Sequence, residues 1–170
     1  IARNSDWVLP IHAGTEIGVA STKAFVGQLT VLYILCLKLA IVRKDINDKT
    51  YEKNINNLKK LPEAIKECIS NENKIQLMAK EFLSAKGSMF LGRGSSFPIA
   101  LEGALKLKEL SYLHAEGYPA GEMKHGPLAL IEEGLPVIIL APKDKYFEKT
   151  ISNMQEVIAR GGKILFITDN

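Results

Sequence analysis

Three charged residues recur at helical spacing in the middle of this sequence: Glu102, Lys106 and Glu109. At about 100° per residue they fall within an arc of roughly 60° on an otherwise mostly apolar helix, so they are expected to face a wet pocket or an interface. A carboxylate beside an ammonium, such as Glu109 beside Lys106, can serve there as a proton-transfer base, because burial and a nearby cation act on a carboxyl group in opposite directions and can leave it ionised but basic. The same spacing also permits a plain ion-pair ladder, worth about 0.2–0.5 kcal/mol per exposed pair.

A histidine, His125, follows in the sequence Lys124-His125-Gly126-Pro127. Because a residue that precedes proline is biased away from helix, the histidine is expected on a loop or at the end of an element, where functional side chains concentrate. Imidazole titrates near neutral pH and can move protons. The alternative is a surface or capping histidine. His114 is interpreted as structural, at the end of a helix, and His12 as a loop residue.

A glycine turn, Gly92-Arg93-Gly94-Ser95-Ser96, leads into the helix that carries the charged stripe. It lacks the third glycine of a dinucleotide fingerprint, and the chain has no Walker lysine. A loop that joins a strand to a helix can still cradle an anion, because its N–H groups are unpaired. The turn alone therefore predicts no particular ligand.

The apolar pattern indicates how these residues are positioned. Short apolar strands are predicted at residues 6–11, 88–92, 135–140 and 163–168. Helices are predicted at residues 24–42, 51–69, 72–86, 97–113 and 146–160, with Pro62 as a candidate break in the second. Apolar strands that alternate with helices are typical of an α/β fold with a parallel sheet and helices on both faces.

Residues at the ends of these elements support the boundaries. Ser21 or Thr22 can cap the helix at 24–42, and Ser95 or Ser96 can cap the helix that begins at residue 97. Two glycines, at positions 161 and 162, are expected to end the last helix. The first strand has no earlier strand to pair with, and the chain stops after a strand. The sequence is therefore interpreted as a fragment: the tail of one α/β unit, a helical linker and most of a second unit.

Composition excludes several classes of protein. A length of 170 residues with 46% hydrophobic content allows one domain and part of another, and a net charge of +3 is too mild for a nucleic-acid-binding surface. Cys36 and Cys68 are too few for a disulfide framework or a metal site, which favours a reducing, cytoplasmic compartment. No signal peptide is expected. The apolar run at 24–42 is interrupted by Gln28, Thr30 and Lys38, so it is interpreted as a buried core helix, with an interface helix as the alternative, and not as a membrane span.

Several ordered segments resemble the isomerase half of the glutamine–fructose-6-phosphate aminotransferase family. The resemblance runs across essentially the whole chain. It rests on residues 13–25 (AGTEIGVASTKAF), 91–94 (LGRG), 100–109 (ALEGALKLKE), 114–116 (HAE) and 124–131 (KHGPLALI).

The resemblance implies two sugar isomerase (SIS) domains in tandem, each a flavodoxin-like parallel sheet flanked by helices. Residues 1–45 would be the C-terminal end of the first SIS domain, residues 46–71 a helical linker and residues 72–170 most of the second SIS domain. The family transfers glutamine-derived ammonia to fructose 6-phosphate and isomerises the product to glucosamine 6-phosphate. No cofactor, metal, nucleic acid or membrane is implied.

The resemblance also implies roles for individual residues. Glu109 would move the proton between C1 and C2 of the sugar, and Lys106 would hold the sugar oxygens and stabilise developing negative charge. His125 would act in ring opening and reach the site of a neighbouring subunit, which implies a homodimer. Val19 and Ser21 fall on positions that line the sugar site, and Glu16 lies beside them.

Other parts of the family's machinery are expected outside this sequence. The glutaminase domain with its nucleophilic cysteine and the phosphate-binding loops of the first SIS domain would precede Ile1, and the imine-forming lysine would follow Asn170. The fragment alone is then expected to be inactive. Two alternatives remain open: a SIS-domain sugar-phosphate deaminase or isomerase without a glutaminase domain, and a non-catalytic SIS module that binds a sugar phosphate or only dimerises.

Overall fold

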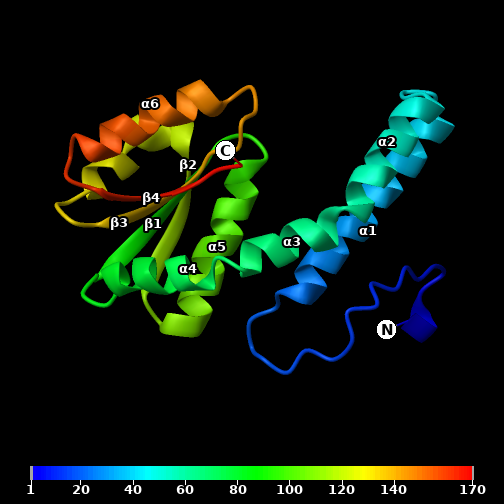
Figure 1. Cartoon of the computed structure of the whole chain (residues 1–170), viewed down its shortest axis with the longest axis horizontal. Coiled ribbons are helices and arrows are strands. Elements are labelled where there is room, and N and C mark those ends of the chain that lie inside the picture. The colour runs from blue at the N-terminus through cyan, green and yellow to red at the C-terminus, as the bar shows by residue number, and fades with distance from the viewer. Residues whose placement is uncertain (1, 170) are drawn as a thin grey trace. The chain divides into compact units, whose positions relative to one another are not determined.

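A computed structural model describes residues 2–169 of the chain, which divide into two compact units, one ending at Glu72 and the other beginning at Asn73 (Figure 1). The N-terminal unit holds a short 3-10 turn, η1 (Ala2–Asn4), an irregular stretch, and the helices α1 (Lys23–Val42), α2 (Asp48–Lys59) and α3 (Leu61–Ile69). The Tyr33 hydroxyl donates to Asn54 Oδ1 over 2.7 Å, and Lys38 Nζ lies 4.6 Å from the centre of the Tyr51 ring. These contacts show that α1 and α2 form an antiparallel hairpin.

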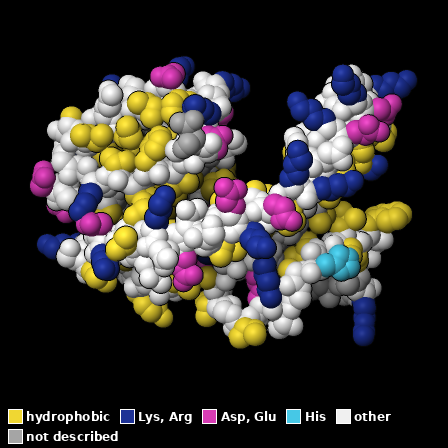
Figure 2. Space-filling view, viewed as in Figure 1, with side chains coloured by type: hydrophobic (Ala, Val, Ile, Leu, Met, Phe, Trp, Pro, Cys, Tyr) yellow, Lys and Arg dark blue, Asp and Glu magenta, His cyan; other side chains and the backbone are white. Residues whose placement is uncertain are grey.

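Two sequence predictions for this unit are wrong. Residues 6–11 form no strand, because the described part of the unit contains no other strand to satisfy their backbone N–H and C=O groups. Helix α1 forms at nearly the predicted residues but is not buried: Leu37 is its only buried residue in the structure described. The described part of this unit has no sheet for α1 to pack on, and its contacts with α2 and with Ile11 leave most of its large apolar side chains exposed. Hydrophobic side chains lie at the surface in Figure 2.

The C-terminal unit is built on four parallel strands in the order β2-β1-β3-β4. The strands are β1 (Gly87–Gly92), β2 (His114–Pro119), β3 (Pro136–Leu140) and β4 (Lys163–Ile167). The helices are α4 (Glu72–Ala79), α5 (Ser96–Ser111) and α6 (Phe147–Ile158), with 3-10 turns η2 (Lys80–Phe82), η3 (Ala120–His125) and η4 (Pro127–Leu130). The predicted α/β class with a parallel sheet flanked by helices is confirmed.

Alternation along β1 places the two main helices on opposite faces of the sheet. The Phe90 ring lies against Gly103 of α5, where an added Cβ would be 2.9 Å from the ring. Met89 and Leu91 point the other way and join the core cluster that includes Val157 of α6. The sheet is therefore sandwiched between α5 and α6, as Figure 1 shows.

The edge strand β2 was not predicted from the sequence, and the interpretation of His114 as the end of the preceding helix is wrong. Helix α5 stops at Ser111, and Tyr112 takes a left-handed conformation with φ of 60°. The strand then pairs with β1 from Gly87 opposite His114 to Gly92 opposite Pro119. Gly117 is needed because an added Cβ would lie 2.9 Å from the Leu101 backbone. A glycine and a proline in a short, polar strand gave no strand signal.

Helix ends follow the sequence predictions in part. The predicted helix at 51–69 is divided at Lys60, with Pro62 in the first turn of α3, and Gly161 at φ of 82° follows α6. The predicted helix at 72–86 ends at Ala79 and continues as a 3-10 turn. Ser95 occupies the N-cap position of α5, but its side chain makes no capping hydrogen bond. The prediction that the Ser95 side chain caps this helix is therefore wrong.

Candidate active site

The charged stripe on α5 forms the ladder that its spacing allowed. Lys106 Nζ lies 2.7 Å from Glu109 Oε2 and 3.2 Å from Glu102 Oε1. All three side chains are partly buried, with 22% of Lys106, 24% of Glu102 and 29% of Glu109 exposed. The shorter contact joins Lys106 to Glu109, the carboxylate predicted to be the base. Two carboxylates thus share one ammonium, so the stripe carries a net negative charge when all three groups are ionised.

Electrostatics keep Lys106 protonated. Its pKa is raised, first by the hydrogen bond to Glu109 and then by Glu102. A lysine that remains an ammonium can donate hydrogen bonds to substrate oxygens and offset negative charge that develops on them. The arrangement is compatible with both interpretations of the stripe, because an ion-pair ladder and a held carboxylate base use the same three groups.

His125 lies at the end of η3, on a segment anchored by its neighbours. Met123 is fully buried in the core, and Lys124 Nζ pairs with Glu156 Oε1 of α6 at 3.0 Å. Gly126 has φ of 136°, which ends η3 beside the proline as the sequence predicted. The His125 side chain is 75% exposed, and its Nε2 lies 3.8 Å from Glu122 Oε2. No hydrogen bond or ion pair joins His125 to Glu109 within residues 2–169, so a shared site stays a prediction.

The predicted substrate-binding residues in the N-terminal unit lie on the loop before α1. Val19 is 90% exposed. Glu16 has a structural role that was not predicted: its Oε1 accepts from the backbone N–H of Ala24 at 3.1 Å and of Thr22 at 3.3 Å. Glu16, and not Ser21 or Thr22, therefore caps α1, because Thr22 at the N-cap position makes no side-chain capping bond.

The cap at Glu16 predicts a pH-dependent contribution to stability. Its pKa is lowered, chiefly by the hydrogen bond from the Ala24 N–H, so the stabilisation is present above the carboxyl's ordinary pKa and is lost as the pH falls through the lowered value. Replacing Glu16 with alanine is expected to speed amide hydrogen exchange at Ala24 at pH 7 and to change it much less at pH 3. The matched control is Glu63→Ala, in the first turn of α3. Equal effects of Glu16→Ala at both pH values would contradict the cap.

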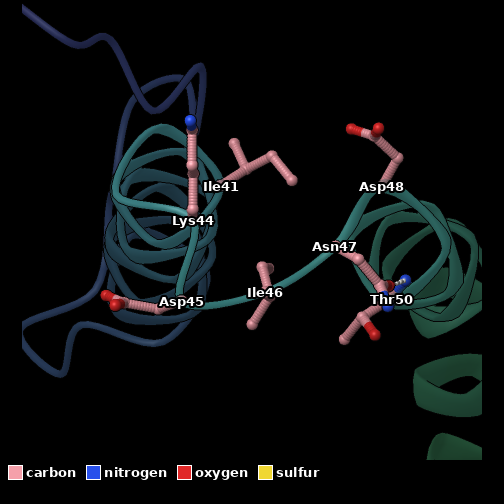
Figure 3. A pocket seen from close by; sticks show the side chains of 7 residues that line it. All are labelled: Ile41, Lys44, Asp45, Ile46, Asn47, Asp48 and Thr50. Carbon is pink, nitrogen blue, oxygen red and sulfur yellow. Dashed lines mark hydrogen bonds between the residues drawn. The ribbon is translucent and has the colours of Figure 1, made fainter.

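A surface pocket elsewhere in the N-terminal unit contains none of the predicted site residues. It lies at the turn between α1 and α2 and is lined by Ile41, Lys44, Asp45, Ile46, Asn47, Asp48 and Thr50 (Figure 3). Two of its polar side chains have local partners: Asn47 Oδ1 accepts from the Thr50 N–H at 2.9 Å, and Asp45 pairs with Arg43 at 3.0 Å. These contacts shape the turn, so this pocket is not the candidate active site.

A further polar cluster on β2 was not predicted from the sequence. The Tyr118 hydroxyl donates to Glu116 Oε2, which raises the pKa of Tyr118, and His114 Nε2 lies 3.6 Å from Glu116 Oε1. The three residues alternate along the strand and so share one face of it. The sequence would have predicted this cluster only if residues 114–119 had been identified as a strand. Among the residues described, no group of three or more His, Cys, Asp and Glu is placed to hold a metal ion.

Comparisons with known proteins agree with this fold. The sequence model of the SIS domain matches residues 81–170. The chain is 52% identical over 169 residues to the glutamine–fructose-6-phosphate aminotransferase (isomerizing) of Bartonella quintana, covering 99% of this chain and 28% of that protein. The chain thus spans 28% of the length of that curated relative.

Solved structures of related proteins also resemble this chain. The C-terminal domain of glucosamine-fructose-6-phosphate aminotransferase from Francisella tularensis superposes with a TM-score of 0.91 at 45% identity, covering 92% of this chain and 44% of that chain. A putative phosphosugar isomerase from Silicibacter pomeroyi superposes with a TM-score of 0.77 at 31% identity, covering 94% of this chain and 46% of that chain.

Proposed function

Because this chain belongs to the SIS domain family, we propose that it is part of the isomerase domain of a glutamine–fructose-6-phosphate aminotransferase. The full-length enzyme would convert fructose 6-phosphate and glutamine-derived ammonia to glucosamine 6-phosphate. Support comes from the high identity to such enzymes over nearly the whole chain. The observation that carries the proposal is the Lys106–Glu109 contact of 2.7 Å, a carboxylate held against an ammonium on the helix that covers the sheet.

The proposal assigns the two ends of the chain to different SIS domains. Residues 1–45 form the C-terminal end of a first SIS domain, residues 46–71 a helical linker and residues 72–170 most of the second. In such an arrangement the apolar side chains of α1 pack against the rest of the first domain in the full-length protein. Their exposure here supports this, since a helix with apolar residues on all sides is normally buried.

Each predicted site residue has a role in the proposed reaction. The Glu109 carboxylate takes the proton from C1 of the opened sugar imine and delivers it to C2, which turns a ketose derivative into an aldose derivative. Lys106, kept as an ammonium, donates to the sugar oxygens and offsets the negative charge that develops between these two carbons. During ring opening, His125 exchanges protons with the ring oxygen and the anomeric hydroxyl of the sugar.

The substrate and assembly follow from the same assignment. The sugar phosphate contacts Val19 and Ser21 on the loop before α1, with Glu16 beside them as the cap that fixes this loop. His125 acts in the site of a neighbouring subunit of a cytoplasmic homodimer. Its exposed position on an anchored segment is what a residue that reaches another subunit requires.

Glutamine dependence tests the proposed function. The full-length protein, supplied with fructose 6-phosphate and glutamine, is expected to form glucosamine 6-phosphate and glutamate, and to form no amino sugar when both glutamine and ammonia are withheld. Product is measured by chromatography with mass detection. A protein that only releases ammonia from glucosamine 6-phosphate would be a SIS-domain deaminase. Binding of sugar phosphate without any turnover would indicate a non-catalytic module.

A further inference from the structure

An arginine after β1 is built into the junction between η3 and α6. Arg93 Nη1 donates to Asn153 Oδ1 of α6 over 3.2 Å, and the side chain is half-buried. Its guanidinium lies directly over Gly121 of η3: a Cβ added there would be 2.9 Å from Nη1 and 3.1 Å from Cζ. A residue with any side chain at position 121 would therefore push the guanidinium away. Arg93 thus contacts both elements at once.

The segment that carries His125 is consequently held by three separate contacts. Met123 fills the core beside Val157, and Lys124 pairs with Glu156 of α6. Arg93 covers the first turn of η3 and fixes it to Asn153 of the same helix. Asn153 and Glu156 are three residues apart and so lie on one face of α6. This face of α6 and the Arg93 side chain therefore both contact the segment η3, of which His125 is the last residue.

We propose that Arg93 is a positioning residue for His125. The inference rests on the proposed function, in which the His125 imidazole moves protons at the sugar. Arg93 would not touch the substrate; it holds the backbone of η3 at the place from which His125 reaches the sugar. Its planar guanidinium suits this task, because it can lie flat on the glycine backbone while one edge donates to the Asn153 side chain. Displacement of a catalytic group by about 1 Å can cost on the order of 100-fold in rate.

The test is a double-mutant cycle in the full-length enzyme. Arg93→Ala alone is expected to lower kcat on the order of 10- to 100-fold with little change in KM for fructose 6-phosphate. In a His125→Ala background, Arg93→Ala is expected to have almost no further effect on kcat, because the group it positions is gone. An Arg93→Ala effect of the same size in both backgrounds would show that the arginine acts independently of His125 and would overturn the proposal.

Two further variants protect the test against simple loss of folding. Asn153→Ala removes the hydrogen-bond acceptor of Arg93, and Gly121→Ala displaces its guanidinium. Arg93 itself is retained in both variants, and both should lower kcat as Arg93→Ala does. Arg160→Ala, which removes an exposed arginine just after α6, is the control and should leave kcat unchanged. Thermal unfolding of each variant checks that the fold persists.

The cycle also separates this inference from the proposed function. If His125→Ala lowers kcat but Arg93→Ala, Asn153→Ala and Gly121→Ala do not, the positioning role alone fails. If His125→Ala leaves kcat unchanged, the proposed role of His125 fails and the role of Arg93 fails with it.

Discussion

Replacing Glu109 with glutamine in the full-length enzyme is expected to lower the formation of glucosamine 6-phosphate on the order of 100- to 10,000-fold, the range typical of a lost general base. The amide oxygen of glutamine can still accept a hydrogen bond from Lys106. A neutral acceptor therefore replaces the carboxylate in the contact of 2.7 Å, and the helix should persist. Only the capacity to take up a proton is lost. Fructose 6-phosphate should therefore still bind, as measured by calorimetry, while product formation in a coupled assay disappears.

The chain supplies a matched control for this variant in Glu102. Its carboxylate contacts the same lysine at 3.2 Å, is buried to a similar degree and lies on the same helix face. Glu102→Gln removes the same charge from the same ladder, so it reports the electrostatic effect on Lys106 without removing the proposed base. It is expected to keep activity within about tenfold of the unmodified enzyme. Equal losses from the two substitutions would indicate that the stripe is a structural ladder and that Glu109 is not the base.

The second large effect is expected for His125→Ala, on the order of 100-fold or more in kcat with fructose 6-phosphate as substrate. The imidazole is mostly exposed and has one described partner, Glu122 at 3.8 Å, so its loss should cost little stability. A large fall in rate with an unchanged unfolding midpoint would therefore point to chemistry and not to folding.

Mixed dimers test the proposal that His125 acts in the site of a neighbouring subunit. A dimer made from one Glu109→Gln subunit and one His125→Ala subunit has one site with both groups intact if His125 reaches across the interface. Activity should then reappear when the two inactive variants are mixed and allowed to exchange subunits. If the histidine serves its own subunit, every site lacks one group and mixing restores nothing. Homodimers of each variant, treated in the same way, are the controls.

The sequence predicted much of the second unit correctly because its signals are local. Apolar runs marked β1, β3 and β4, and the helical period marked α5 and placed Glu102, Lys106 and Glu109 on one face. A helical face is set by residues three and four apart, so the ladder needs no distant contact to form. Gly126 before a proline likewise determined the end of η3.

The failures in the N-terminal unit have one physical cause. A run such as 6–11 is a strand only if another strand pairs with it, and the apolar surface of α1 is buried only if another element covers it. Neither condition can be read from the run itself. The cap of α1 was missed for a related reason, because Glu16 reaches the Ala24 N–H from eight residues away, beyond the spacing of a standard capping box.

The sequence by itself thus determined the α/β class of the second unit, the charged face of α5 and the chemical types of its candidate site residues. Only the tertiary structure decided that β2 is an edge strand and that Arg93 lies on Gly121 and binds Asn153, a residue 60 positions away. Helical faces depend on neighbouring backbone geometry, which local sequence encodes. Contacts between distant segments depend on how complete elements pack, and no local pattern specifies that packing.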